Sequence, residues 1–343
     1  MLGTFPMTPR ECVITALDHQ KPEILPYQLY MDPAVRDAVD REMGGRRWRD
    51  SLIPFFHETW FVYPNRETRP DGRYVDAFGS LWESGSIMHH LQPAMPEPSF
   101  KGFQWPNLDT IWDQQQPKLA EAISLNPNSY HWAAFGFGLF ERAWTLRGFN
   151  EILMDLAGEP AFCEDLFDQI MEHQMKLVGL LLTLDIDAIF FSDDWAYQKG
   201  LIMGPELWRQ MIKPRKARMI EQVHRAGKKA ILHCCGSVME VLPEIVEIKL
   251  DCLQSLQPEA MDVFEIKRRH GDSLALWGGG PSQSLIPFGT PAEIRAAFAR
   301  LRHELGAGGG YICAPSKPLL SETPVANAVA AIEGTIGHPL PRG

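Results

Sequence analysis

From about residue 126 onward, short apolar runs alternate with longer segments in which apolar residues recur at helical spacing. Short apolar runs bounded by turn residues are typical of buried strands, and the helical spacing is typical of amphipathic helices. The pattern predicts strands over residues 130–137, 188–192, 229–233, 252–256, 274–278 and 311–314. It predicts helices over residues 149–158, 160–182, 205–226, 237–248, 262–270, 291–305 and 324–336.

The regular alternation of strand and helix, with short connections, favours a parallel sheet. An earlier run over residues 24–30 supplies a seventh predicted strand. Repeated units of this length fit a TIM (β/α)8 barrel better than an open sheet, although the pattern does not locate the eighth strand. We therefore expect an α/β protein with a TIM-barrel fold.

The first third of the chain departs from this pattern. Residues 35–125 are rich in proline and in aromatic residues, which is too aromatic a composition for a linker. We interpret this stretch as an ordered, irregular, loop-rich elaboration that packs against the barrel. A single domain over residues 1–343 accommodates both parts.

Charge and composition narrow the class of protein. The formal net charge of −10 argues against a general nucleic-acid binder. The longest apolar run, residues 177–191, is interrupted by Asp185 and Asp187, so we expect no membrane span. The N-terminus lacks a basic segment followed by an apolar one, and we expect a cytoplasmic protein. Six cysteines are too few for a disulfide scaffold and would stay reduced in that compartment.

Polar residues gather where the predicted strands end, and in a TIM barrel these ends carry the chemistry. The residues concerned are Asp193, Asp194 and Trp195 after one strand, His233, Cys234 and Cys235 at the next, then Gln254, and Cys313 through Lys317 at the last. We expect these side chains to converge on one mouth. The alternative is that strand ends are polar only because they run into loops.

His233 and Cys235 form the sharpest local pattern. Residues two apart on a strand point to the same face, so the imidazole and the thiol lie together while Cys234 points into the wall. Nitrogen and sulfur ligands suit Zn²⁺, and a third soft ligand, Cys313, would leave a fourth position open for catalysis. The alternative is three buried small residues without a metal. Asp193, Asp194 or Ser316 are candidate replacements for a ligand.

Asp193 and Asp194 are adjacent, so only one is expected to enter the site while the other caps a turn. We favour Asp193 as the inward residue, acting as a zinc ligand, a hydrogen-bond acceptor or a proton shuttle together with Lys317. A purely structural role for both carboxylates is the alternative. Candidate substrate-binding residues are Tyr30, Asp194, Trp195 and Gln254.

Motifs along nearly the whole chain resemble the uroporphyrinogen decarboxylase superfamily. They are Thr8-Pro9-Arg10-Glu11, Ala16-Leu17-Asp18-His19, Gly138-Leu139-Phe140-Glu141-Arg142-Ala143-Trp144, Asp193-Asp194, Gly204-Pro205-Glu206, His233-Cys234-Cys235-Gly236-Ser237, Gln257-Pro258, Phe288-Gly289-Thr290-Pro291, Gly309-Gly310-Tyr311-Ile312 and Ala314-Pro315. The resemblance implies a TIM barrel. It also implies one of two activities: metal-free decarboxylation of uroporphyrinogen, or zinc-dependent methyl transfer with corrinoid proteins.

The two branches make different demands on the sequence. Decarboxylases resemble one another in an arginine-rich segment after the first strand, whereas residues 28–33 of this chain contain no arginine. Paired arginines bind carboxylates bidentately, so a substrate with many carboxylates is poorly matched here. The methyltransferase branch shares the His-x-Cys pair, and its third ligand, a cysteine, falls on Lys317. The resemblance leaves Cys313 or an aspartate to take that ligand's place.

These features predict a zinc-dependent methyltransferase, an O-demethylase component. It would move a methyl group from a small methylated compound, for preference a methoxylated aromatic, to a corrinoid (cobalamin) carried by a partner protein. A cofactor-free decarboxylase or lyase, with Asp193 and Lys317 handling protons and carboxylates, is the main alternative. A non-catalytic corrinoid- or ligand-binding protein is the third. A homodimer is possible on the evidence of related barrels.

Overall fold

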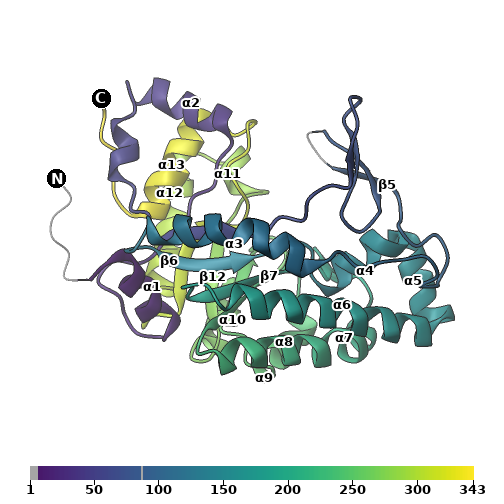
Figure 1. The fold of residues 1–343 in the computed structure, drawn as a ribbon. Helices are drawn as coiled ribbons and strands as arrows, with labels where there is room; N and C mark the ends of the chain where they lie inside the picture. Colours follow the sequence, from purple (N-terminus) through teal and green to yellow (C-terminus); the bar gives the residue numbers. More distant parts are fainter. Residues whose placement is uncertain (1–6, 86–87) are drawn as a thin grey trace.

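A computed structural model describes residues 7–85 and 88–343. Its centre is a curled seven-stranded parallel sheet in the order β1-β6-β7-β10-β11-β12-β13 (Figure 1). The strands are β1 (Phe56–Trp60), β6 (Tyr130–Ala134), β7 (Ala188–Ser192), β10 (Lys229–His233), β11 (Cys252–Leu256), β12 (Ala275–Gly280) and β13 (Tyr311–Pro315). The sheet confirms the α/β fold, and its curled half-barrel form is consistent with a TIM-like barrel.

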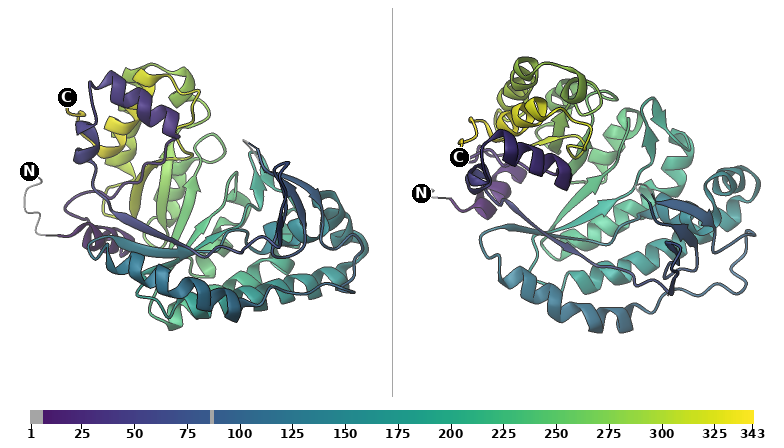
Figure 2. Two further views of the ribbon diagram at one scale, coloured as in Figure 1. Left: turned by 45° about the horizontal axis from the view of Figure 1, so that its top comes forward. Right: turned by 90° about the horizontal axis from the view of Figure 1, so that it is seen from above.

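Helices follow most of these strands and cover the outer face of the sheet (Figures 1 and 2). They are α4 (Leu139–Arg147), α5 (Phe149–Gly158) and α6 (Pro160–Leu181) after β6, then α7 (Pro205–Met211) and α8 (Lys213–Arg225), η2 (Met239–Val241) and α9 (Leu242–Glu247), α10 (Val263–His270), α11 (Leu285–Phe288) and α12 (Pro291–Glu304), and α13 (Val325–Ile336). A short hairpin, β8 (Ala196–Tyr197) with β9 (Gly200–Leu201), follows β7. Every strand and helix predicted beyond residue 126 has a counterpart here.

The helix predicted over residues 205–226 is divided in two at Ile212. Pro214 lies in the first turn of α8 and has no amide hydrogen to continue the helical hydrogen bonding. The side chain of Arg215 donates to the carbonyl oxygens of Gln210 and Met211, at 3.2 and 2.9 Å, which satisfies the acceptors left by the break.

The strand predicted over residues 24–30 is represented by isolated bridges. Tyr27 and Met31 pair in parallel with Cys313 and Leu319, so this segment runs beside β13 without becoming a strand of the sheet. The strand that the sequence pattern missed is β1, which pairs in register with β6 from Phe56 to Trp60. His57 and Glu58 interrupt its apolar character, and this explains why no strand was predicted there.

Residues 35–125 were interpreted as irregular, and this is wrong for much of the stretch. Besides β1 it contains α2 (Pro33–Glu42), η1 (Arg47–Ser51) and the long helix α3 (Leu108–Ser124). A four-stranded antiparallel sheet, β2 (Glu67–Thr68), β3 (Arg73–Val75), β4 (Leu81–Glu83) and β5 (His89–Gln92), also belongs to it. The remaining helix, α1 (Pro9–Leu17), begins with a capping box between Thr8 and Glu11.

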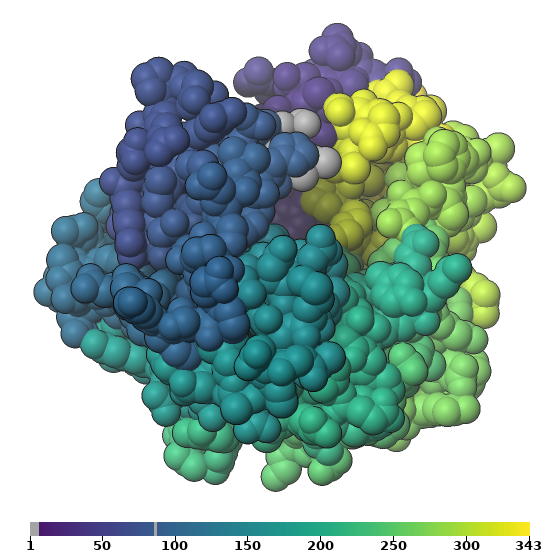
Figure 3. Space-filling model, turned by 90° about the vertical axis from the view of Figure 1, so that its right-hand side faces the viewer, coloured from purple at the N-terminus to yellow at the C-terminus, as the bar shows by residue number. Residues whose placement is uncertain are grey.

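The antiparallel sheet and the group formed by α2, α11, α12 and α13 stand apart on the two sides of the parallel sheet (Figure 2). The space-filling view shows a hollow between them (Figure 3). Among the described residues, no helix is both long and apolar enough to cross a bilayer.

Candidate functional site

The parallel register assigns each strand residue to one of the two faces of the sheet, because side chains alternate along a strand. His233 pairs with Ser192 on β7 and with Gln254 on β11, and Gln254 pairs with Trp277 on β12. The rings of Phe190 and His233 stack at 6.5 Å, and the ring of Phe190 also meets that of Trp277. This row of side chains therefore faces the interior of the barrel.

Three potential metal ligands meet at the end of β7 and β10. The side chains of Asp194, His233 and Cys235 each offer one ligand atom, and these atoms lie within 4.8 Å of one another. His233 Nε2 is 3.1 Å from Cys235 Sγ and 3.6 Å from Asp194 Oδ1. The structure thus brings together the His-x-Cys pair predicted from the sequence. It adds the carboxylate of Asp194 as a third potential ligand.

Neighbouring groups fix the orientation of these ligands. Gln254 Oε1 is hydrogen-bonded to His233 Nδ1, which leaves Nε2 directed toward Cys235. An oxygen acceptor on the far nitrogen is the usual outer partner of a metal-binding histidine. Asp194 Oδ1 accepts a hydrogen bond of 2.8 Å from the amide of Cys235, so the carboxylate also shapes the loop that presents the thiol. Gln254, predicted as a substrate-binding residue, lies instead behind the imidazole.

Lys317 reaches the same cluster from the loop that follows β13. Its Nζ donates to Cys235 Sγ at 2.7 Å, and a cavity of about 540 Å³ adjoins it on the side of α11. Burial lowers the pKa of Lys317, but attraction to Cys235 and to Asp194 outweighs this, so the pKa lies above its ordinary value. The amine therefore stays protonated at neutral pH, and the structure brings it into the site as the sequence predicted.

The protonation of the two strongest ligand candidates follows from burial. Desolvation lowers the pKa of His233, against the attraction of Asp194, and so favours the neutral imidazole. Desolvation and Asp194 raise the pKa of Cys235 to about 11 in the absence of a metal, although Lys317 opposes this. The neutral imidazole of His233 and the thiol of Cys235 are both groups that can bind a zinc ion, because zinc binding displaces the thiol proton.

Asp193 lies on the opposite face, which reverses our prediction for the two aspartates. It is fully buried, and its carboxylate accepts from the amides of Leu139, Phe140 and Glu141 at 2.8 to 3.1 Å, at the start of α4. The fully buried Lys216 Nζ lies 3.8 Å away. Asp193 is therefore a helix cap and a buried ion-pair partner, and it does not reach the mouth.

Gly138 explains how α4 comes so close to Asp193. A Cβ atom at Gly138 would lie 2.4 Å from the carbonyl oxygen of Ser192 and 2.5 Å from Asp193 Cβ. Both contacts are shorter than side chains tolerate, so only glycine allows the helix to begin on the carboxylate.

Cys313 is not part of the cluster. It pairs with Gly278, one residue out of step with the inward row that contains Trp277, and so it faces the helices outside the sheet. The side chain is fully buried, and its sulfur lies near Tyr311 and Arg302 of α12. The structure thus does not support Cys313 as the third ligand, and Asp194 occupies that place.

Three further predictions concern Trp195, Cys234 and Tyr30. Trp195 is fully buried and packs against Trp208 with ring centroids 5.4 Å apart, so it belongs to the core and not to a substrate pocket. Cys234 points into the wall as predicted, where its sulfur accepts from the amide of Trp195 at 3.4 Å. Tyr30, in contrast, is 39% exposed at the mouth and donates to Glu58 on β1.

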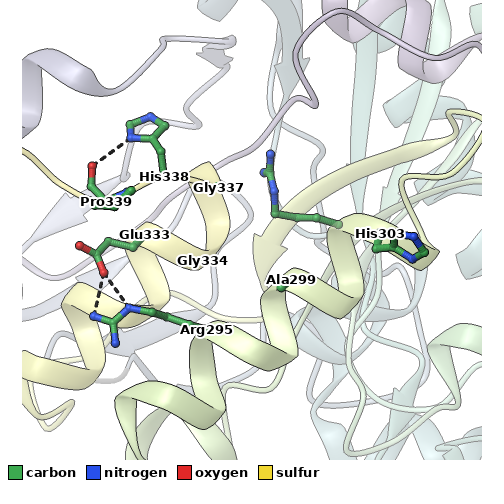
Figure 4. Close-up of a pocket in the computed structure, with 9 residues that line it drawn as sticks. Arg295, Ala299, His303, Glu333, Gly334, Gly337, His338 and Pro339 are labelled. Atoms are coloured by element: carbon green, nitrogen blue, oxygen red, sulfur yellow. Dashed lines mark hydrogen bonds and ion pairs between the residues drawn. The ribbon is translucent and has the colours of Figure 1, made fainter.

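A separate cavity of about 530 Å³ lies between α12 and α13, outside the barrel (Figure 4). Arg295 there is ion-paired with Glu333 at 2.7 Å, and His338 is bonded to the carbonyl oxygen of Pro339. None of the residues that line it belongs to the mouth.

The barrel-like parallel sheet with a cluster of donors at the carboxyl ends of its strands defines a class of α/β proteins that place their chemistry there. The profile of the uroporphyrinogen decarboxylase (URO-D) family matches residues 127–335. Because the match covers more than half of the chain, the protein belongs to the URO-D family. Among curated protein sequences, no significant match to the chain was found.

Similar folds occur among solved structures. A methyltransferase from Methanosarcina mazei superposes with a TM-score of 0.70 at 17% identity, covering 96% of this chain and 98% of that protein. At this identity the likeness concerns the fold alone. A D-psicose 3-epimerase from Clostridium cellulolyticum H10 reaches a TM-score of 0.37 at 13% identity, covering 59% of this chain and 70% of the epimerase, which is too low to carry an argument.

Proposed function

We propose that this protein is a zinc-dependent methyltransferase that moves a methyl group from a small methylated compound, for preference a methoxylated aromatic, to a corrinoid held by a partner protein. The observation that carries the proposal is the convergence of His233 Nε2, Cys235 Sγ and a carboxylate oxygen of Asp194 at the mouth of the barrel. This donor set fits zinc, which takes nitrogen, sulfur and oxygen ligands, and it leaves a fourth position for the substrate.

His233, Cys235 and Asp194 would hold the ion. When bound, zinc supplies a Lewis acid beside the oxygen from which the methyl group departs. Gln254 keeps the imidazole in the orientation that presents Nε2, and the amide of Cys235 keeps Asp194 beside it. These contacts prepare the ligands before the ion arrives.

Lys317 is the candidate general acid. The methyl carbon would pass to the reduced corrinoid of the partner protein, which supplies the electron pair of the new bond, while the pair of the broken C–O bond stays on the oxygen of the donor. That oxygen takes a proton from the Lys317 ammonium, which yields the free hydroxyl compound. Lys317 Nζ lies 2.7 Å from Cys235 Sγ and therefore stands beside the proposed metal ligands, and the space-filling view shows a hollow between the antiparallel sheet and the group of α2, α11, α12 and α13 (Figure 3). Asp193, fully buried, takes no part in this step.

The decarboxylase alternative is less well supported. It assigned proton and carboxylate handling to Asp193 and Lys317, but Asp193 is fully buried behind α4. Residues 28–33 also lack the arginines that a polycarboxylate substrate requires.

The test combines metal analysis with a transfer assay. The purified protein should contain about one zinc per chain and should methylate cobalamin reduced to the Co(I) state when supplied with methoxylated aromatics. Release of CO₂ from a cyclic carboxylate by the metal-free protein, together with no bound zinc, would overturn the proposal in favour of a lyase.

A further inference from the structure

Glu58 lies on the interior face of β1 and is surrounded by neutral donors. In register with Trp132 of β6, it belongs to the same inward row as Phe56 and Trp60. Its Oε1 accepts from Gln28 Nε2 at 2.9 Å and from the hydroxyl of Tyr30. Its Oε2 accepts from Trp60 Nε1 at 3.2 Å. Among the described residues, Glu58 forms no ion pair.

One acceptor position on this carboxylate remains free. A carboxylate offers about four lone-pair sites, two on each oxygen. Oε1 has two donors and Oε2 has one, so Oε2 can accept one further hydrogen bond. Glu58 is half-buried, and its neighbours Trp60 and Tyr30 are 43% and 39% exposed, so this group borders solvent.

Aromatic rings connect Glu58 to the metal cluster. The ring of Trp60 meets that of Trp132 at 5.6 Å, Trp132 stacks on Phe190 at 4.6 Å, and Phe190 stacks on His233. The indole nitrogen of Trp132 is buried and has no hydrogen-bond partner within residues 7–85 and 88–343. Trp132 and Phe190 are themselves buried, so this row of rings is a packed part of the inner surface, with His233 and the candidate metal ligands at one end of the row and Glu58 beside Trp60 at the other.

The segment that carries Tyr30 also borders Lys317. The backbone of Tyr30 accepts from the amide of Leu319 at 2.9 Å, so the Glu58 group lies next to the strand end that supplies the candidate acid. The carboxylate and the donor cluster therefore belong to one mouth, at the two ends of the row of rings.

We propose that Glu58 determines substrate specificity by accepting a hydrogen bond from a hydroxyl group on the aromatic ring of the methyl donor. This inference rests on the proposed function and adds to it the class of donor: a phenolic methyl ether, not one in which every hydroxyl is capped. Glu58, held by Gln28, Tyr30 and Trp60, fixes one end of the ring so that the methoxy group meets the other wall.

The experiment measures binding, not turnover. The zinc-loaded protein is titrated calorimetrically with 2-, 3- and 4-methoxyphenol and with the corresponding dimethoxybenzenes, in which a second methoxy group replaces the hydroxyl and no donor is left. Hydrogen bonds to a charged acceptor typically change a binding constant by about tenfold or more. The best-bound methoxyphenol should therefore bind about tenfold or more tightly than its dimethoxy counterpart.

Two variants and a control locate the effect. Glu58→Gln keeps the shape but places an amide donor where an acceptor is needed, so the preference should fall to within about threefold. Trp60→Phe removes one donor and keeps the carboxylate, so the preference should persist even if Glu58→Gln folds poorly. Glu247→Gln, exposed on α9 and paired with Lys213, should bind like the wild type.

Equal binding of both series, absence of binding to either, or a preference retained in Glu58→Gln would each overturn the inference. Zinc content and methylation of cobalamin are measured on the same preparations. Bound zinc and transfer without the hydroxyl preference would reject the role of Glu58 alone, whereas loss of both zinc and transfer in the wild type would reject the proposed function.

Discussion

The inner and outer faces of the parallel sheet carry the same kinds of side chain but use them differently. On the inner face Asp194, His233 and Cys235 approach one another at the mouth. On the outer face Asp193 caps α4 and Cys313 is fully buried against the helices. An aspartate and its immediate neighbour thus belong to different chemical environments. Side chains alternate between the two faces along a strand. A shift of one residue therefore moves a side chain from the solvent-accessible mouth to the buried outer face of the sheet.

Substitution of the adjacent cysteines Cys234 and Cys235 should show the largest difference between the two faces. Cys235→Ser should remove zinc from the protein and abolish methyl transfer, with a loss greater than the roughly 10- to 100-fold that follows from removing an outer partner of a ligand. Cys234→Ser should keep its zinc, because that sulfur faces the wall and accepts from Trp195. Metal analysis of both variants by mass spectrometry decides the matter. Equal loss of zinc in the two variants would mean that the faces are not distinct.

The adjacent aspartates should separate stability from metal binding. Asp193→Asn leaves the buried Lys216 without its counter-charge, and we expect the free energy of unfolding to fall by roughly 3–5 kcal/mol. Asp194→Asn should change stability by less than about 1 kcal/mol because its side chain is at the mouth. It should instead weaken zinc binding. Urea unfolding and zinc titration of both variants provide the two measurements.

A double variant tests whether the stability lost in Asp193→Asn comes from the unpaired charge of Lys216. Adding Lys216→Met to Asp193→Asn removes the unpaired charge and should restore most of the lost stability. If the double variant is no more stable than the single one, the ion pair is not the reason for burying Asp193.

The sequence predicted the fold more fully than it predicted the site, and the apolar strands show why. The strands of the barrel are buried on both faces, so their alternation cannot be recognised from hydrophobicity. The run Ala188–Ser192 is apolar on both faces, and nothing in it indicates whether Asp193 or Asp194 points inward. The run Tyr311–Pro315 hides the outward direction of Cys313 in the same way.

His233 and Cys235 were predictable because both are metal-binding residue types and they lie two residues apart at the end of a strand, a spacing that puts both side chains on one face. Glu58 was missed for the opposite reason. A polar residue inside a barrel strand weakens the apolar pattern that reveals the strand, and β1 was interpreted as part of a loop-rich stretch. Its only signal was the run of aromatic residues around it, and such a run is equally typical of an elaboration that packs against the barrel.

The pH dependence of stability depends on Glu141 of α4, which both aspartates influence. Burial, with Asp193 and Asp194, raises the pKa of Glu141 from 4.5 to about 8. Folding therefore takes up a proton between these values, and the free energy of unfolding falls as the pH rises through that window. Glu141→Gln stays neutral, so it should gain stability relative to the wild type from pH 5 to pH 8.5, by roughly 3–4 kcal/mol.

Urea unfolding of both proteins at the two pH values, with a chelator present, measures this gain. Because the glutamine side chain does not titrate, all of the difference in pH dependence comes from Glu141. Stability curves that run parallel in pH would show that the carboxyl group is ionised in the folded protein, and that the two aspartates do not act on it.

The central claim, that the inner face holds a zinc ion through one sulfur, one imidazole and one carboxylate, is tested most directly by zinc X-ray absorption spectroscopy of the purified protein. The account predicts a first shell with a single sulfur at about 2.3 Å and nitrogen or oxygen neighbours at about 2.0–2.2 Å. A shell without sulfur, a shell with two sulfurs, or a protein that binds no zinc would contradict it.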